Sequence, residues 1–239
     1  MNKDVIQIQE MTQRFFQQQK QIYGDEFVFS DPDLKRFLWN ETGSADLQEF
    51  FLEVRNCTRC PLSETRKNVV FGSGNGQANL MLIGEAPGEQ EDLQGEAFVG
   101  KAGQLLDKIL AAIQFGRDEV YIANILKCRP SNNRDPLPRE IEQCMPYLKK
   151  QIALIRPRII LALGRISAQT LLNTTQSLGQ LRKKQHVFQN IPLIVTYHPA
   201  ALLRHPEWKR ATWQDVQRVR KLYDELVGDK EKWTPPNPK

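Results

Sequence analysis

Four short, nearly continuous apolar runs constrain the fold of this 239-residue chain. Each run is typical of a buried strand: they are Asn79–Gly84, Val120–Asn124, Arg158–Leu163 and Leu193–Tyr197. Helical patterns lie between and after them, at Gly103–Ile113, Pro138–Ile155, Arg165–Leu172 and Trp208–Val227. Strands that alternate with helices predict a parallel sheet with helices on both faces. We therefore expect an α/β fold with three layers, αβα, around a short central parallel four-stranded sheet.

The same pattern divides the chain into three parts. Residues 1–24 carry a loose helical stripe of apolar residues, and residues 1–45 are expected to form a helical N-terminal extension. Residues 46–228 hold the strand and helix signals and form the expected main domain. Residues 229–239, which end in WTPPNPK, are expected to be disordered.

Composition and charge place the chain in a broad class. Hydrophobic content of 40% and charged content of 26% are ordinary for a soluble globular protein. No apolar run approaches the roughly 20 residues of a membrane span, and the N-terminus lacks the apolar core of a signal peptide, so we expect a cytoplasmic monomer away from membranes. Residues 1–56 have a net charge of −4 and residues 57–239 one of +9. A basic body suits a polyanionic partner, although a solvated mixed surface explains the charge equally well.

The chain has four cysteines, with the spacing C-x2-C-x67-C-x15-C: Cys57, Cys60, Cys128 and Cys144. In a reducing cytosol, such thiols are more often metal ligands than disulfide partners. The alternative is four unrelated buried cysteines, and the CxxC pair weighs against it. The spacing alone does not separate zinc from an iron–sulfur cluster, because four cysteines suit both.

Polar side chains follow the predicted strands, where ligands of parallel sheets bind. Glu85 lies in a GEAPG turn, Asn124 ends the second strand, and His198 follows the fourth. An amide both donates and accepts hydrogen bonds, as the recognition of a nucleobase edge requires, and Phe98 in a glycine-rich loop would offer a stacking surface. Each residue also has a plain structural interpretation: a solvated turn, a turn start, a structural histidine or a loop anchor.

Three further motifs have competing interpretations. Leu202, Leu203 and Arg204 suit an apolar wedge beside a phosphate contact, or simply the first turn of a helix. Residues 95–102 resemble the phosphate-binding pattern GxxxxGK[ST], but Ala102 lacks the hydroxyl that holds Mg²⁺, which disfavours an NTPase. The glycine-rich residues 72–76 precede a strand and are expected to form a flexible loop.

Taken together, the CxxC, GEAPGEQED, FVGKAGQLL, VYIANILKCRP and HPAALLR motifs resemble the family 4 uracil-DNA glycosylases, the iron–sulfur branch of their superfamily. The resemblance covers roughly residues 50–227. It implies an enzyme of base excision repair that flips deoxyuridine out of single- or double-stranded DNA and hydrolyses its N-glycosidic bond, leaving an abasic site. No basic, histidine-bearing insertion like that of the covalently linking relatives follows KCRP, so the chain looks like a turnover enzyme.

The resemblance also implies a role for each site residue. The four cysteines would bind a [4Fe–4S] cluster. The uracil pocket would comprise the Ala86 amide, Phe98 for stacking, Asn124 at the pyrimidine edge and His198 at O2. Glu85 would orient or activate water, and Glu91 would crowd C5 of the base and exclude the methyl group of thymine.

Other functions stay open beside this one. A non-catalytic iron–sulfur module that only binds nucleic acid would keep the cysteines and the basic body, and a glycosylase for other deaminated bases would keep the pocket. The role of residues 1–45 is open between packing on the sheet and recruiting a protein partner. Their net negative charge argues against an arm that grips DNA.

Overall fold

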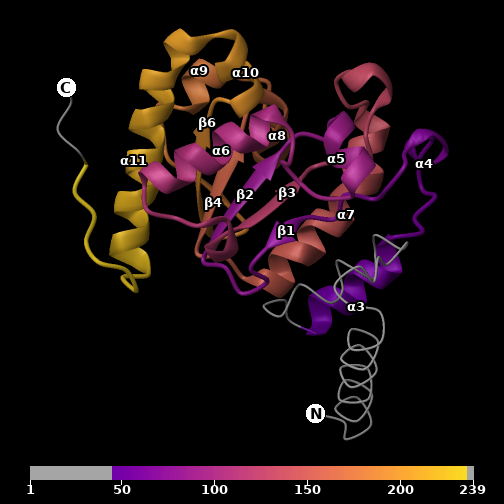
Figure 1. Cartoon of the computed structure of the whole chain (residues 1–239), viewed down its shortest axis with the longest axis horizontal. Helices are drawn as coiled ribbons and strands as arrows, with labels where there is room; N and C mark the ends of the chain where they lie inside the picture. Colours follow the sequence, from indigo (N-terminus) through magenta and orange to yellow (C-terminus); the bar gives the residue numbers. More distant parts are fainter. Residues whose placement is uncertain (1–44, 236–239) are drawn as a thin grey trace, which may run out of the picture. The chain divides into compact units, whose positions relative to one another are not determined.

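The computed structural model describes residues 45–235, so the predicted extension, apart from residue 45, lies outside the described residues. These residues form a sheet with the strand order β1-β3-β2-β4-β6-β5 (Figure 1). The four central strands, β3, β2, β4 and β6, run parallel, as expected. Their bounds are β2 Leu80–Gly84, β3 Tyr121–Asn124, β4 Ile159–Leu163 and β6 Ile191–Thr196.

Two short edge strands extend this sheet beyond the expected four. β1, Ser73–Gly74, pairs antiparallel with β3, and β5, His186–Phe188, pairs antiparallel with β6. The glycine-rich residues 72–76 therefore include an edge strand, where a flexible loop was expected. Strands of two and three residues carry no apolar run, so the sequence pattern gives no signal for them.

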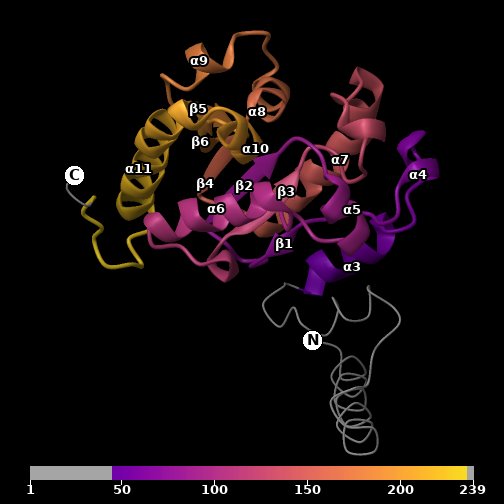
Figure 2. The same ribbon diagram turned by 45° about the horizontal axis from the view of Figure 1, so that its top comes forward.

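Helices cover both faces of the sheet, as Figures 1 and 2 show. Their bounds are α3 Ala45–Val54, α4 Leu62–Thr65, α5 Glu89–Gln94, α6 Lys101–Ala112, α7 Pro138–Ile155, α8 Arg165–Leu172, α9 Leu178–Leu181, α10 Pro199–Arg204 and α11 Lys209–Leu226. Short 3₁₀ turns lie at Arg117–Glu119, Ser131–Asn133 and Pro206–Trp208. None of the helices within residues 45–235 is both long and apolar enough to cross a membrane.

The three layers follow from the alternation of side chains along each strand. Met81 and Ile83 of β2 pack in one core with buried residues of α3, α7, α8 and α9. Leu80 and Leu82 of the same strand pack in a second core with α6 and α11. A strand that is buried on both faces reads as a continuous apolar run, which is why the central strands were predictable.

The segment after α11 differs from the disordered tail that the sequence predicts. The Trp233 ring lies edge-on against Trp213, with ring centroids 5.7 Å apart. Arg220 donates a hydrogen bond to the main-chain oxygen of Glu231 at 2.5 Å, and Lys230 forms an ion pair with Glu119. Residues 229–233 are thus held against the domain, because a tryptophan and two charged residues in this polar stretch find partners on it.

Candidate active site

The carboxyl ends of β2, β3, β4 and β6 lie at one edge of the sheet, where parallel α/β proteins bind their ligands. Gly84 ends β2 and pairs in register with Asn124, which ends β3. Glu85 follows β2 directly, and His198 lies two residues beyond the end of β6. The shared edge therefore brings together residues that are more than 100 positions apart in the sequence.

Glycine at the end of β2 makes room for the neighbouring side chains. A Cβ atom on Gly84 would lie 2.3 Å from the Asn124 Oδ1 atom and 2.7 Å from the Phe98 ring. Both distances are shorter than any van der Waals contact, so a side chain at position 84 would displace one group or the other. Gly164, after β4, has φ +91°, and a Cβ atom there would lie 2.9 Å from the His198 Cβ atom.

The Phe98 ring joins this cluster from the loop between α5 and α6. It is 5% exposed, and its centroid lies 5.4 Å from that of the His198 ring, with an angle of 33° between the planes. The ring also lies against Gly84, where it would be 2.7 Å from an added Cβ atom. The structure thus brings Phe98, Asn124 and His198 together at the ends of β2, β3 and β6.

Asn124 carries a buried acceptor that the protein leaves unpaired. Its side chain is 2% exposed, and its Oδ1 atom has no hydrogen-bond partner among the described residues. A buried polar atom without a partner costs about 1–3 kcal/mol. At the end of a strand, beside an aromatic ring, Asn124 Oδ1 is therefore available to accept a hydrogen bond.

His198 is held as a neutral imidazole with a defined tautomer. Its Nδ1 atom accepts a hydrogen bond from the Ala200 main-chain N–H at 3.2 Å and so caps α10. Burial of the ring, together with the positive charge of Arg204, lowers the pKa of His198 to about 4. At neutral pH the ring therefore carries one proton, on Nε2, and that N–H is the donor available for a ligand.

Glu85 is a half-buried carboxyl that titrates close to neutrality. Burial raises its pKa to about 7, the negative charge of Asp135 raises it as well, and Arg165 opposes them. Asp135 and Arg165 form an ion pair with a closest approach of 2.6 Å. A carboxyl with this pKa exchanges protons readily at pH 7, as a general base must. Asp135 and Arg165 carry no sequence signal for this role, since both lie in unremarkable charged segments.

Glu91 is placed as a brace for the Phe98 loop. Its Oε1 atom accepts hydrogen bonds from the main-chain N–H groups of Val99 at 3.0 Å and Gly100 at 2.9 Å, at the start of α6. Its Oε2 atom lies only 2.7 Å from the position of a Cβ atom on Gly88. The carboxylate thus ties the loop that carries Phe98 to α5, on which Glu91 lies.

The three residues expected to form a wedge separate in the structure. Leu203 is 48% exposed and Arg204 is also exposed, as the expectation requires. Leu202 is 1% exposed, because it lies on the inner face of α10 and faces the protein interior. Leu202 therefore does not belong to the wedge, and the expectation for this residue was wrong. The one-turn helix that positions it was the alternative interpretation of the motif.

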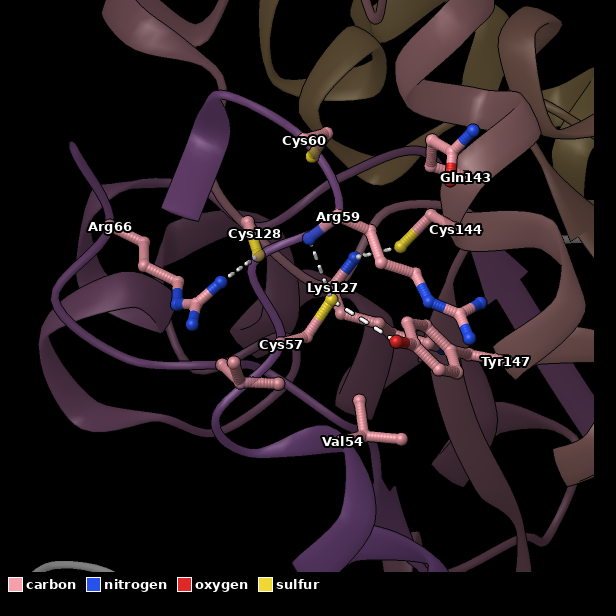
Figure 3. A pocket seen from close by; sticks show the side chains of 11 residues that line it. Val54, Cys57, Arg59, Cys60, Arg66, Lys127, Cys128, Gln143, Cys144 and Tyr147 are labelled. Carbon is pink, nitrogen blue, oxygen red and sulfur yellow. Dashed lines mark hydrogen bonds between the residues drawn. The ribbon is translucent and has the colours of Figure 1, made fainter. Parts of the chain in front are cut away.

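The four cysteines line one cavity, shown in Figure 3. Cys57 and Cys60 come from the segment between α3 and α4, Cys128 follows β3, and Cys144 lies in α7. The other lining residues include Arg59, Arg66, Lys127 and Tyr147. Within residues 45–235, no three histidine, cysteine or acidic side chains are arranged to hold a single metal ion. The predicted ligands thus share a cavity, and nothing in their arrangement identifies the bound species.

Hydrogen-bond donors surround the sulfur atoms of this cavity. Tyr147 Oη donates to Cys57 Sγ at 3.1 Å, and Arg66 Nη1 donates to Cys128 Sγ at 3.3 Å. The Lys127 main-chain N–H donates to Cys144 Sγ at 3.3 Å. Burial raises the pKa of the Cys144 thiol to about 12 and also raises that of Cys128. Without a bound cation, burial keeps these thiols protonated. If a metal centre binds and converts them to thiolates, the surrounding donors are placed to stabilise the negative charge on sulfur.

Lys127 connects the cysteine cavity with the strand-end site. It is 1% exposed, and its Nζ atom donates to the main-chain oxygen of Asn124 at 2.9 Å. Its own main-chain N–H donates to Cys144 Sγ. Burial lowers the pKa of the Lys127 ammonium group to about 8, and the neighbouring Cys144 and Cys128 oppose this shift. No sequence motif singles out this lysine, since a buried lysine is recognised only once its partners are known.

Comparisons with known proteins agree with one another. A protein-family model described as "Uracil DNA glycosylase superfamily" matches residues 71–217. The type-4 uracil-DNA glycosylase of Archaeoglobus fulgidus is 42% identical over 193 residues, which cover 77% of this chain and 95% of that protein. That of Pyrobaculum aerophilum is 44% identical, covering 72% of this chain and 91% of the relative. That of Saccharolobus solfataricus is 45% identical, covering 70% and 82%.

Proposed function

Because the chain belongs to the type-4 uracil-DNA glycosylases of the uracil-DNA glycosylase superfamily, we propose that its strand-end site binds a flipped-out deoxyuridine and hydrolyses its N-glycosidic bond. The family makes the chain an enzyme of DNA repair that acts on glycosyl bonds of DNA. The roles of the individual residues are the proposal. The unpaired, buried Asn124 Oδ1 atom beside Phe98 is the observation that carries it.

Uracil is selected by the edge of Asn124 and the face of Phe98. The amide of Asn124 offers an acceptor and a donor side by side, which matches the N3–H donor and O4 acceptor of uracil. The buried Oδ1 atom stays unpaired unless the base brings a donor, so a base with an acceptor at N3 is penalised. The Phe98 ring supplies a flat apolar surface on which the base stacks.

Charge develops on the base as the glycosidic bond breaks. The leaving uracil becomes an anion whose charge is shared by O2, and His198 donates its Nε2–H to this oxygen. A neutral imidazole can fill this role, because it donates a hydrogen bond to the anion and keeps its own proton. The main-chain N–H of Ala86, in the turn after β2, is proposed as a further donor to the base.

Glu85 acts on the sugar side of the bond. Its carboxylate orients the attacking water and accepts a proton from it, while its negative charge offsets the positive charge that grows on the sugar. Leu203 occupies the space left in the DNA by the flipped nucleotide, and Arg204 contacts a phosphate. Glu91, which holds the Phe98 loop, limits the space beside C5 by fixing that loop.

A [4Fe–4S] cluster is the cofactor we propose for Cys57, Cys60, Cys128 and Cys144. When bound, it supplies the iron cations that keep the four thiols deprotonated and cross-link three segments of the chain: the one between α3 and α4, the one after β3, and α7. Lys127 then links the cysteine cavity to the strand-end site, because its main-chain N–H bonds to Cys144 and its side chain bonds to the Asn124 carbonyl.

The first prediction concerns the pocket. Asn124→Ala and His198→Ala should each slow uracil release from DNA by about 100- to 1,000-fold, the usual effect of removing a donor that stabilises developing charge. Binding to uracil-containing DNA, measured by fluorescence anisotropy, should change little. His186→Ala is the matched control. His186 lies on the edge strand β5, where it pairs with Leu193 of β6, and its ring hydrogen-bonds to the main-chain oxygen of Leu181, away from the site.

Unchanged release by either pocket variant would exclude the assigned site. The same assay on hypoxanthine- and xanthine-containing DNA, single- and double-stranded, separates the uracil enzyme from one that acts on other deaminated bases. Binding without release from any substrate would instead identify a nucleic-acid-binding module.

The second prediction is a pH profile. Glu85 works as the carboxylate, so kcat/KM for uracil release should rise as the pH increases through about 7 and then level off. The pKa of His198 is about 4, so this residue should add no step of its own to the rise between pH 6 and 8. Asp135→Asn removes a negative charge beside Glu85 and should move the midpoint to lower pH. Glu89→Gln, on the exposed side of α5, should leave the midpoint in place. A profile that is flat between pH 5 and 8 contradicts the role of Glu85.

The third prediction concerns the cofactor. Protein purified without oxygen should be brown and contain about four iron atoms per chain, with matching acid-labile sulfide. Cys128→Ser should lose most of this iron and become more sensitive to protease between residues 57 and 66, because the cluster no longer ties that segment to β3 and α7. A colourless protein that carries stoichiometric zinc would contradict the assignment.

A further inference from the structure

The loop that carries Phe98 adopts an unusual backbone conformation. Phe98 has φ +55°, in the left-handed region that aromatic residues seldom enter. A conformation of this kind persists only where surrounding groups hold it in place, and it often marks a functional site. Here the held residue is the one whose ring lies at the strand-end pocket.

Arg117 supplies the hold on the carbonyl side of this loop. It lies in the 3₁₀ turn Arg117–Glu119, before β3. Its Nη1 atom donates to the Phe98 main-chain oxygen at 3.0 Å, and its Nη2 atom donates to the Ala97 main-chain oxygen. One guanidinium thus bonds to two successive carbonyl groups, both of which belong to buried residues.

The guanidinium is itself anchored from behind. Nη1 also donates to Asp107 Oδ1 of α6 at 3.0 Å, and Nη2 donates to Ser73 Oγ of β1 at 3.2 Å. Glu96 adds a more distant ion-pair partner at 3.8 Å. Only a planar fork reaches all these acceptors at once; the ammonium of a lysine is a point charge that cannot.

The groups on the other side of Phe98 also hold the loop in place. Glu91 binds the next two main-chain N–H groups, those of Val99 and Gly100. A Cβ atom on Gly103 would lie 1.7 Å from the Phe98 oxygen, so α6 approaches this carbonyl closely. Arg117 on the carbonyl groups and Glu91 on the amides thus grip Phe98 from both sides.

We propose that Arg117 is a positioning residue for uracil recognition: it fixes the Ala97 and Phe98 carbonyl groups, and through them sets the Phe98 ring where the base stacks. The inference rests on the proposed function of the site. Arg117 does not touch the base or the sugar. It acts by holding the stacking surface ready before the substrate arrives, so that binding does not have to order the loop.

This role predicts a particular division of kinetic effects. A stacked ring contacts the base equally in the ground state and in the transition state, so loss of its position weakens binding more than it slows the chemical step. In the holoenzyme, Arg117→Lys should raise KM for uracil-containing DNA roughly tenfold and weaken inhibition by free uracil to a similar degree, within the range that base stacking supplies. We expect kcat to change by less than about threefold.

A double-mutant cycle separates positioning from general stability. If Arg117 acts through the ring, Arg117→Lys should have little further effect on KM and on uracil inhibition once Phe98→Leu has removed the ring. Arg220→Lys is the matched control. Like Arg117, Arg220 donates to two main-chain oxygens, those of Ile113 and Glu231, but it is buried and lies on the α11 side of the domain. It should lower the melting temperature without altering uracil inhibition.

Asp107→Asn provides a milder version of the same test, in case Arg117→Lys does not fold. It removes the charge that anchors the guanidinium and should raise KM and weaken uracil inhibition in the same direction, by a smaller factor. The proposal is overturned if Arg117→Lys and Asp107→Asn, or whichever of them folds, keep wild-type KM and uracil inhibition. It is also overturned if the effects of Arg117→Lys and Phe98→Leu on these two quantities are additive. Absence of uracil release by the wild-type enzyme would instead contradict the proposed function, so the two failures are distinguishable.

Discussion

The site depends on the missing side chain at the carboxyl end of β2. Gly84 lies between Asn124 and Phe98, and a single Cβ atom there would overlap both. Parallel pairing of β2 with β3 sets Asn124 beside Gly84, and burial on both faces of the sheet fixes that register. The pairing of the strands therefore positions the Asn124 amide, and the absence of a side chain at Gly84 leaves room for the Phe98 ring beside it.

The cysteines and the reacting groups have separate roles that meet in one residue. Glu85, Asn124 and His198 stand at the ends of strands, whereas the cysteines line a cavity beside α7. Lys127 bonds to Cys144 on one side and to the Asn124 carbonyl on the other. In this arrangement the proposed cluster would support the end of β3, and the proposed uracil pocket lies next to it.

Much of this structure could be predicted from the sequence, because strong periodic patterns dominate it. The bounds of α7 and α8 agree with the expected helices, and the central strands agree within a few residues. The placement of Asn124 and His198 at one edge of the sheet was predictable, because parallel strands gather their carboxyl ends. The edge strands, the placement of residues 229–233 and the inward face of Leu202 were missed, since short pairings and local packing leave no period in the sequence. Arg117 was not selected for a different reason: its partners lie 10 to 44 positions away in the sequence, and no local pattern connects them.

The central claim is that uracil occupies the space bounded by Phe98, Asn124 and His198. A crystal structure of the protein with free uracil tests it most directly. We expect the base to stack on the Phe98 ring, with Asn124 Oδ1 accepting a hydrogen bond from N3–H and His198 Nε2 donating one to O2, each at about 2.7–3.2 Å. Uracil bound elsewhere, or bound with Asn124 Oδ1 still unpaired, would contradict it.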